Sequence, residues 1–208
     1  YGTLFFNTLK AGDAFDCDVN GNGTFDAATE RFYYVSNYYD TSTKSYDSNY
    51  AVLIFYSPVK DGAIYSSITS GVAWSPSKNT TGPTTAITHL PNTSTWSNVS
   101  LKTTSRNILN TSSGTTVSGF SYAGKAARLA TTNELVNCIN SGNTCATAAI
   151  EGLNNNFMWL ETGYKTNTLA YAISSVVPVT ITVSDTTKSG KYIVVKPVID
   201  VAKTDIKY

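Results

Sequence analysis

Side chains that could bind a cation are concentrated in one acidic, glycine-rich stretch near the start of the chain. Oxygen-bearing side chains alternate along it, and glycines stand between them. Hard cations such as calcium take about six to eight oxygen ligands, and a loop of the D-x-[DN]-x-[DN]-G kind supplies them. Counted from Asp16, position twelve is Ala27 where a glutamate is expected. The candidate ligands of a structural calcium ion are Asp16, Asp18, Asn20, Asn22, Asp26 and Glu30.

The same stretch has a second interpretation as a plain hairpin turn. Asn20-Gly21 and Asn22-Gly23 are dipeptides that favour type I′ turns. Carboxylates packed this closely repel one another unless a cation lies between them, which favours the calcium interpretation slightly. Under either interpretation we expect the stretch to be structural rather than catalytic.

The sequence offers little for catalysis. Its one histidine, His89, precedes Leu90-Pro91 in a polar segment, and no nucleophile-elbow motif accompanies it. One histidine and three scattered cysteines do not make a zinc ligand set, and no glycine-rich phosphate loop is present. Glu161 follows Trp159 at strand spacing, so this pair is either a carbohydrate contact or a core tryptophan beside a strand-end glutamate. We therefore predict a protein that is not an enzyme.

Composition favours a protein that works outside the cell or on its surface. Charged residues are 14% of the 208, against roughly 25% in a typical soluble protein. The formal net charge is +1 with no basic run, so a nucleic-acid partner is not expected. No apolar stretch approaches the roughly 20 residues that span a bilayer, so we expect no membrane insertion by this region. Because the chain starts at Tyr1, we expect a signal or anchor to have been removed, or the chain to have been trimmed.

The three cysteines are relevant to whether the protein resides in an oxidising compartment. Cys138 and Cys145 are close in sequence and would close a small disulfide loop in an oxidising compartment, which would leave Cys17 unpaired. The alternative is that both are free thiols.

The pattern of elements predicts one domain of the α+β class, with a mainly antiparallel β-sheet, one or two helices and long loops. Residues 1–57 are expected to form β-hairpins, 58–122 a loop-rich middle with a short helix near 96–108, and 123–208 a helix followed by strands. The clearest helix covers Leu129–Ile139, where Thr131 and Glu134 have capping-box spacing. Strands or short extended segments are expected at Asp13–Asp18, Thr24–Asp26, Glu30–Asn37, Tyr50–Ser57, Phe157–Glu161, Tyr171–Ser175, Val177–Val183 and Lys191–Val201.

Three motifs of the C-terminal half, taken in order, resemble a known family. They are Ala127–Leu135 (R-L-x-T-x-x-E-L), Phe157–Glu161 (W-L-E) and Tyr192–Ile199 (V-x-P-V-I). Their order resembles the C-type-lectin-like fold in its bacterial branch, which includes formylglycine-generating-type domains and secreted proteins with an Arg-Leu-Pro-Thr motif. Ala130 stands here in place of the proline. The first half is similar to predicted surface or pilin-like proteins of gut Firmicutes.

The resemblance implies that the terminal strands pair and that long middle loops carry a binding site. Our leading expectation is a non-enzymatic surface recognition or adhesion module that binds an extracellular glycan or protein. The alternatives are a self-associating subunit of a pilus-like or other surface assembly, and a hypervariable ligand-display protein. The expected ligand-binding residues, of the adaptable polar and aromatic kind, are Trp159, Glu161, Tyr164, Asn167 and Tyr171.

Overall fold

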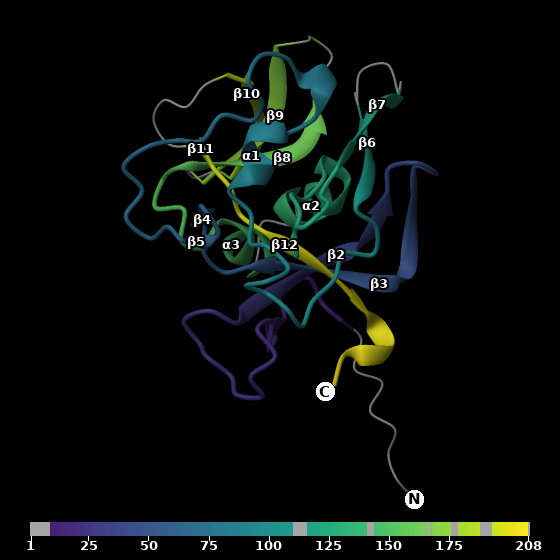
Figure 1. The fold of residues 1–208 in the computed structure, drawn as a ribbon, viewed down its shortest axis with the longest axis vertical. Helices are drawn as coiled ribbons and strands as arrows, with labels where there is room; N and C mark the ends of the chain where they lie inside the picture. The colour runs from purple at the N-terminus through teal and green to yellow at the C-terminus, as the bar shows by residue number, and fades with distance from the viewer. Residues whose placement is uncertain are drawn as a thin grey trace, which may run out of the picture.

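The fold is built around two four-stranded β-sheets (Figure 1). The computed structural model describes residues 9–109, 116–140, 144–164, 166, 168–175, 179–187 and 193–207. In the view of Figure 1 the first sheet lies below the second, and α2 lies between them. The helices are α1 (Thr84–Thr88), α2 (Thr132–Asn140) and α3 (Thr144–Ile150), with short 3₁₀ turns η1 (Asn79–Thr81) and η2 (Lys203–Asp205).

The first sheet joins the two ends of the described chain. Its strands are β1 (Ala14–Asp16), β2 (Arg31–Asp40), β3 (Ser45–Phe55) and β12 (Val198–Ala202), in the order β1-β2-β3-β12. Every neighbouring pair is antiparallel, and β12 pairs with β3 with Val198 opposite Ile54. The last described strand therefore completes a sheet that the first strands begin.

The second sheet is built only from the C-terminal half. It contains β8 (Phe157–Gly163), β9 (Leu169–Ser174), β10 (Thr180–Asp185) and β11 (Ile193–Val194), in the order β10-β9-β8-β11. β11 runs parallel to β8, and the other pairs are antiparallel. Two small hairpins complete the fold: β4 (Val59–Lys60) with β5 (Ala63–Ile64), and β6 (Ser105–Leu109) with β7 (Thr116–Ser121).

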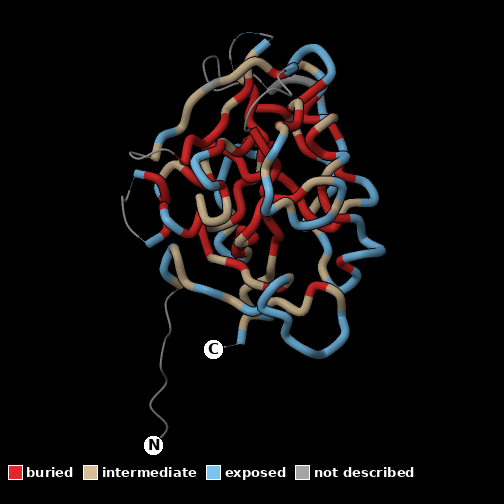
Figure 2. Tube along the Cα trace, turned by 90° about the vertical axis from the view of Figure 1, so that its left-hand side faces the viewer, coloured by how far each residue is buried: buried red, intermediate tan, exposed pale blue. Residues whose placement is uncertain are grey.

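Alternation along the central strands divides the interior into two hydrophobic clusters. In β3, Leu53 and Phe55 belong to one cluster while Val52 and Ile54 belong to the other. Successive side chains of a strand point to opposite faces, so both faces of this strand are covered. Figure 2 shows the buried residues filling the centre, with exposed residues at the periphery. The first cluster contains an aromatic group in which Phe32 and Phe55 lie edge-on to Trp96, with ring centroids 5.6 and 5.3 Å away.

The α+β class is confirmed, with mainly antiparallel strands and short helices. The capping box is also confirmed: the Glu134 backbone N–H donates to Thr131 Oγ1 (3.1 Å), and the Thr131 N–H donates to the Glu134 carboxylate (2.8 Å). The short helix expected near 96–108 is wrong, because Ser105–Leu109 forms strand β6 in a hairpin with β7. Thr24–Asp26 is also not a strand.

A disulfide between Cys138 and Cys145 joins the end of α2 to the start of α3, as predicted. Disulfides are typical of oxidising compartments. None of the described helices is long and apolar enough to cross a membrane.

Replacing both disulfide cysteines with alanine is expected to lower the free energy of unfolding by about 2–3 kcal/mol, because the denatured chain loses a short covalent loop. Denaturant unfolding of Cys138→Ala/Cys145→Ala measures this. Cys17→Ala, which removes the free thiol, is the matched control. Equal losses in the two proteins would contradict the prediction.

Candidate functional site

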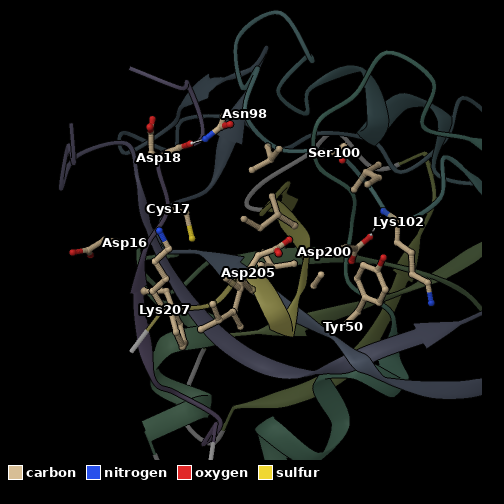
Figure 3. Close-up of a pocket in the computed structure, with 18 residues that line it drawn as sticks. Asp16, Cys17, Asp18, Tyr50, Asn98, Ser100, Lys102, Asp200, Asp205 and Lys207 are labelled. Atoms are coloured by element: carbon tan, nitrogen blue, oxygen red, sulfur yellow. Dashed lines mark hydrogen bonds between the residues drawn. The ribbon is translucent and has the colours of Figure 1, made fainter. Parts of the chain in front are cut away.

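A groove of about 740 Å³ lies against the first sheet, where three distant segments meet (Figure 3). One wall comes from residues 15–18, a second from residues 98–102, and a third from β12 and the residues that follow it. Tyr50 and Leu53 of β3 also line it. A volume of this size is in the range of small-ligand sites.

The groove combines an apolar floor with charged and polar groups. Leu53, Leu101 and Ile199 supply apolar surface. Figure 3 shows Asp200 and Asp205 near the centre, Tyr50 and Lys102 at one end, and Asp16 to Asp18 at the other. Carboxylates, two lysine side chains, an amide and hydroxyls therefore surround a region that can pack against an apolar face of a ligand.

Lys102 is held rigidly at its end of the groove. Its ammonium group pairs with Asp47 and lies 4.7 Å from the centroid of the Tyr50 ring and 4.5 Å from that of Tyr38. Its backbone N–H donates to the Asp200 carboxylate (3.3 Å). A preorganised charge of this kind loses little side-chain freedom when a ligand binds.

A buried ion network holds the carboxylate of Asp200 in place. Arg128 Nη2 donates to Asp200 Oδ1 and to Glu134 Oε1, each at 2.7 Å, and all three side chains are buried. Burial alone would raise the pKa of Glu134, but the Arg128 charge and its hydrogen bonds hold that pKa below its usual value. The first and third motifs of the sequence thus meet in one network, since Arg128 and Glu134 belong to the first and Asp200 follows the third.

Cys17 lines the groove but does not offer a nucleophile. Burial, followed by the charges of Asp16 and Glu30, raises the pKa of its thiol to about 12. Only the thiolate reacts readily, so this side chain stays inert near neutral pH.

His89 has a structural partner at the surface. Its Nδ1 lies 2.7 Å from Asp61 Oδ1, and its backbone carbonyl accepts from the Gly62 N–H (2.9 Å). These contacts fix the turn between β4 and β5. Among the described residues, no serine or threonine hydroxyl bonds the other ring nitrogen.

Two of the predicted ligand-binding residues are corrected by their burial. Trp159 is 1% exposed, and its indole donates to the Val72 carbonyl (2.6 Å). Glu161 is 2% exposed and pairs with Arg106 Nε at 2.9 Å. Both side chains hold the interior together, because β8 is covered on both faces, and neither can reach a ligand at the surface.

The remaining predicted ligand-binding residues lie elsewhere or outside the described part. Tyr164 and Tyr171 are half-buried and stack edge to face, with ring centroids 5.3 Å apart. Asn167 lies outside the described residues. Sequence reasoning singled out Asp16 and Asp18 of the groove as candidate metal ligands but missed the groove itself, because its residues are up to about 190 positions apart and no local pattern joins them.

The predicted metal ligands all lie in or beside the connection between β1 and β2. Asp18, Asn20, Asn22 and Asp26 accept hydrogen bonds from backbone N–H groups of the same loop, and Glu30 is buried at its end. Asp16 is exposed in β1. Among the residues that the structure describes, no three His, Cys, Asp or Glu side chains form a ready metal-binding group.

Comparisons with known proteins assign no family to this chain. No family model matches it, and neither the curated proteins nor the solved structures give a match.

Proposed function

We propose that this chain is a non-enzymatic recognition or adhesion module that acts outside the cell and binds a glycan or protein ligand in the groove over β3 and β12. The main support for this proposal is the groove, because polar and charged groups surround its apolar floor. Sugar hydroxyls and peptide groups both need such hydrogen-bonding partners at fixed positions. The low content of charged residues and the disulfide support the extracellular setting.

Blocking the groove is expected to abolish ligand capture. Ser100 is exposed on the groove wall, and its side chain forms no hydrogen bond with a described residue, so Ser100→Trp fills the space without breaking a contact. Thr95→Trp, at an exposed site of the same segment outside the groove, is the matched control. Glycan and protein arrays probed with both variants and with the wild type should show at least a tenfold loss of signal for Ser100→Trp alone.

A third variant separates the groove from the tyrosine pair predicted from the sequence. Tyr164→Ala/Tyr171→Ala leaves the groove intact, so it should keep its array signals. Loss of binding in this variant, with binding retained in Ser100→Trp, would move the site to the tyrosines and overturn the groove assignment. A wild-type protein that binds nothing on either array would count against the recognition function.

A subunit of a surface assembly is the second candidate, and a sheet edge favours it. β10 is the edge strand of the second sheet and pairs only with β9 among the described strands. Edge strands offer unpaired backbone groups to another chain. Light scattering of the array samples distinguishes the two, since a mass that grows with concentration favours the assembly.

A further inference from the structure

The connection between β1 and β2 is a wrapped loop rather than a tight hairpin turn. The Cys17 backbone N–H donates to the Glu30 carbonyl (2.9 Å) and closes it. Inside, the Asp18 carboxylate accepts from three successive backbone N–H groups, those of Gly21 (2.8 Å), Asn22 (3.1 Å) and Gly23 (2.9 Å). The type I′ turn suggested by the Asn-Gly dipeptides is therefore wrong, because the chain folds around the Asp18 side chain instead.

Three more side chains of the loop also accept hydrogen bonds from its own backbone N–H groups. Asn20 Oδ1 accepts from the Asn22 N–H (2.9 Å), and Asn22 Oδ1 accepts from the Thr24 N–H (2.8 Å). Asp26 Oδ1 accepts from the Ala28 N–H (2.8 Å). Each oxygen is held by the N–H two residues ahead, so alternate side chains are fixed over the loop and not left extended in solvent.

These bonds fix the numbering of the loop. With Asp18 as position one, the oxygen-bearing side chains fall at positions three, five and nine, and Gly23 falls at six with a φ of +75°. A calcium loop of the EF-hand kind uses these side-chain positions, requires glycine at position six, and takes the backbone carbonyl of position seven. Position seven is Thr24, whose carbonyl accepts no hydrogen bond from a described residue. Asp16 falls outside this numbering.

Glu30 points to a bound cation independently of the hydrogen bonds within the loop, because one of its buried carboxylate oxygens has no partner among the described residues. It is 0% exposed although the loop around it is exposed. Its Oε2 accepts from the Asp26 N–H (2.8 Å), which places the carboxylate against the loop, while Oε1 is buried with no hydrogen-bond partner among the described residues. A buried carboxylate oxygen without a partner is costly, and a cation bound in the loop would remove that cost.

We propose that the Asp18–Glu30 loop binds one calcium ion. The ligands are the side chains of Asp18, Asn20, Asn22, Asp26 and Glu30 together with the Thr24 carbonyl. Glu30 stands one position beyond the glutamate of an EF-hand loop, and the turn in which the Thr29 and Glu30 N–H groups donate to the Asp26 carbonyl (2.9 and 2.8 Å) accommodates the shift. Two neutral asparagines among the ligands favour the weak affinity of extracellular calcium modules, with a Kd of about 10⁻⁴–10⁻³ M.

The loop is anchored firmly enough to hold a site. Asn98 Nδ2 donates to the Asp18 carbonyl (2.7 Å), and Ser97 Oγ donates to the Asn20 carbonyl (2.9 Å). The Tyr56 hydroxyl donates to the Ala28 carbonyl (2.6 Å) at the other end. The backbone is thus positioned by residues outside the loop before any cation arrives.

The test compares two ligand variants with one control of the same chemistry. Calcium added to chelator-treated wild type is expected to give one-site binding heat and to raise the melting temperature by about 5–10 °C at a hundredfold excess over Kd. Glu30→Gln and Asp18→Asn each keep a hydrogen-bond acceptor but lose the charge, and should weaken binding at least tenfold. Asp16→Asn, outside the proposed numbering, should bind within twofold of the wild type.

A second readout separates a lost ligand from a damaged fold. Without calcium, Glu30→Gln is expected to melt no lower than the wild type, because a neutral amide is less costly to bury than a carboxylate. The proposal is overturned if calcium at about 10 mM, roughly tenfold above the weakest expected Kd, leaves the wild-type melting temperature and binding heat unchanged. It is also overturned if Asp16→Asn loses as much affinity as Glu30→Gln. An equal rise with magnesium would indicate charge screening and would also count against it.

Discussion

Arg128→Met is expected to lower the free energy of unfolding by about 3–5 kcal/mol, the largest single effect foreseen for this chain. The substitution leaves the Glu134 and Asp200 carboxylates buried without their shared cation. Breaking a buried ion network by removing one partner is strongly destabilising, because the remaining charges lose their compensation. A chain of this size should then melt roughly 6–20 °C lower. Denaturant unfolding at pH 7 measures the loss.

Two companion variants show whether charge is the cause. Arg31→Met removes an arginine that is only half-buried and makes no ion pair with a described residue, so its cost should stay below about 1 kcal/mol. Adding Glu134→Gln and Asp200→Asn to Arg128→Met should restore part of the lost stability, since the stranded charges are then gone. A triple variant less stable than Arg128→Met would contradict this explanation.

Lys196→Met is expected to destabilise the protein by an amount that grows with pH. The Lys196 ammonium group is buried and donates to the carbonyls of Ala148 (3.1 Å), Ala149 (2.9 Å) and Glu151 (2.9 Å) at the end of α3. Without it three carbonyls lose their donor, at about 1 kcal/mol each. The charged form is itself costly here, so the net loss is smallest at low pH.

The direction of the pH dependence follows from burial, which lowers the pKa of Lys196 from 10.5 to about 7. Between these values the unfolded chain binds more protons than the folded one, so wild-type stability rises with pH across this window. From pH 7 to pH 9 the gain is about 2 kcal/mol, and Lys196→Met should lack it. Lys125→Met, which also loses carbonyl contacts but at a half-buried site, is the control and should show a much smaller slope. Parallel pH profiles for wild type and Lys196→Met would rule out the low pKa.

Sequence reasoning succeeded where short-range geometry decides the outcome. Thr131 and Glu134 are three residues apart. At the start of a helix this spacing lets each side chain accept a hydrogen bond from the other residue's backbone N–H. The capping box depends on residue type and local spacing, which the sequence displays directly.

The failures have equally specific causes. Strand spacing placed Trp159 and Glu161 on one face of β8 but could not say that both faces are covered, which depends on distant segments such as Val72 and Arg106. In the acidic stretch, side chains repeat every two residues, so counting from Asp16 or from Asp18 gives equally regular patterns. The hydrogen bonds of Asp18 are the observation on which we base the second numbering in the calcium proposal.

The place of β12 in the first sheet has a consequence for how the molecule is made. β12 pairs with a strand that precedes it by about 145 residues, and Val198 also exchanges backbone hydrogen bonds with Arg128 (3.0 and 2.8 Å). Contacts so distant along the chain slow folding, because a large loop must close before they form. A polypeptide still emerging from a ribosome or a translocation pore lacks the strand that completes its first sheet and the aspartate that neutralises Arg128. Folding of that sheet therefore cannot finish until the residues of β12, Val198–Ala202, are available to pair with β3.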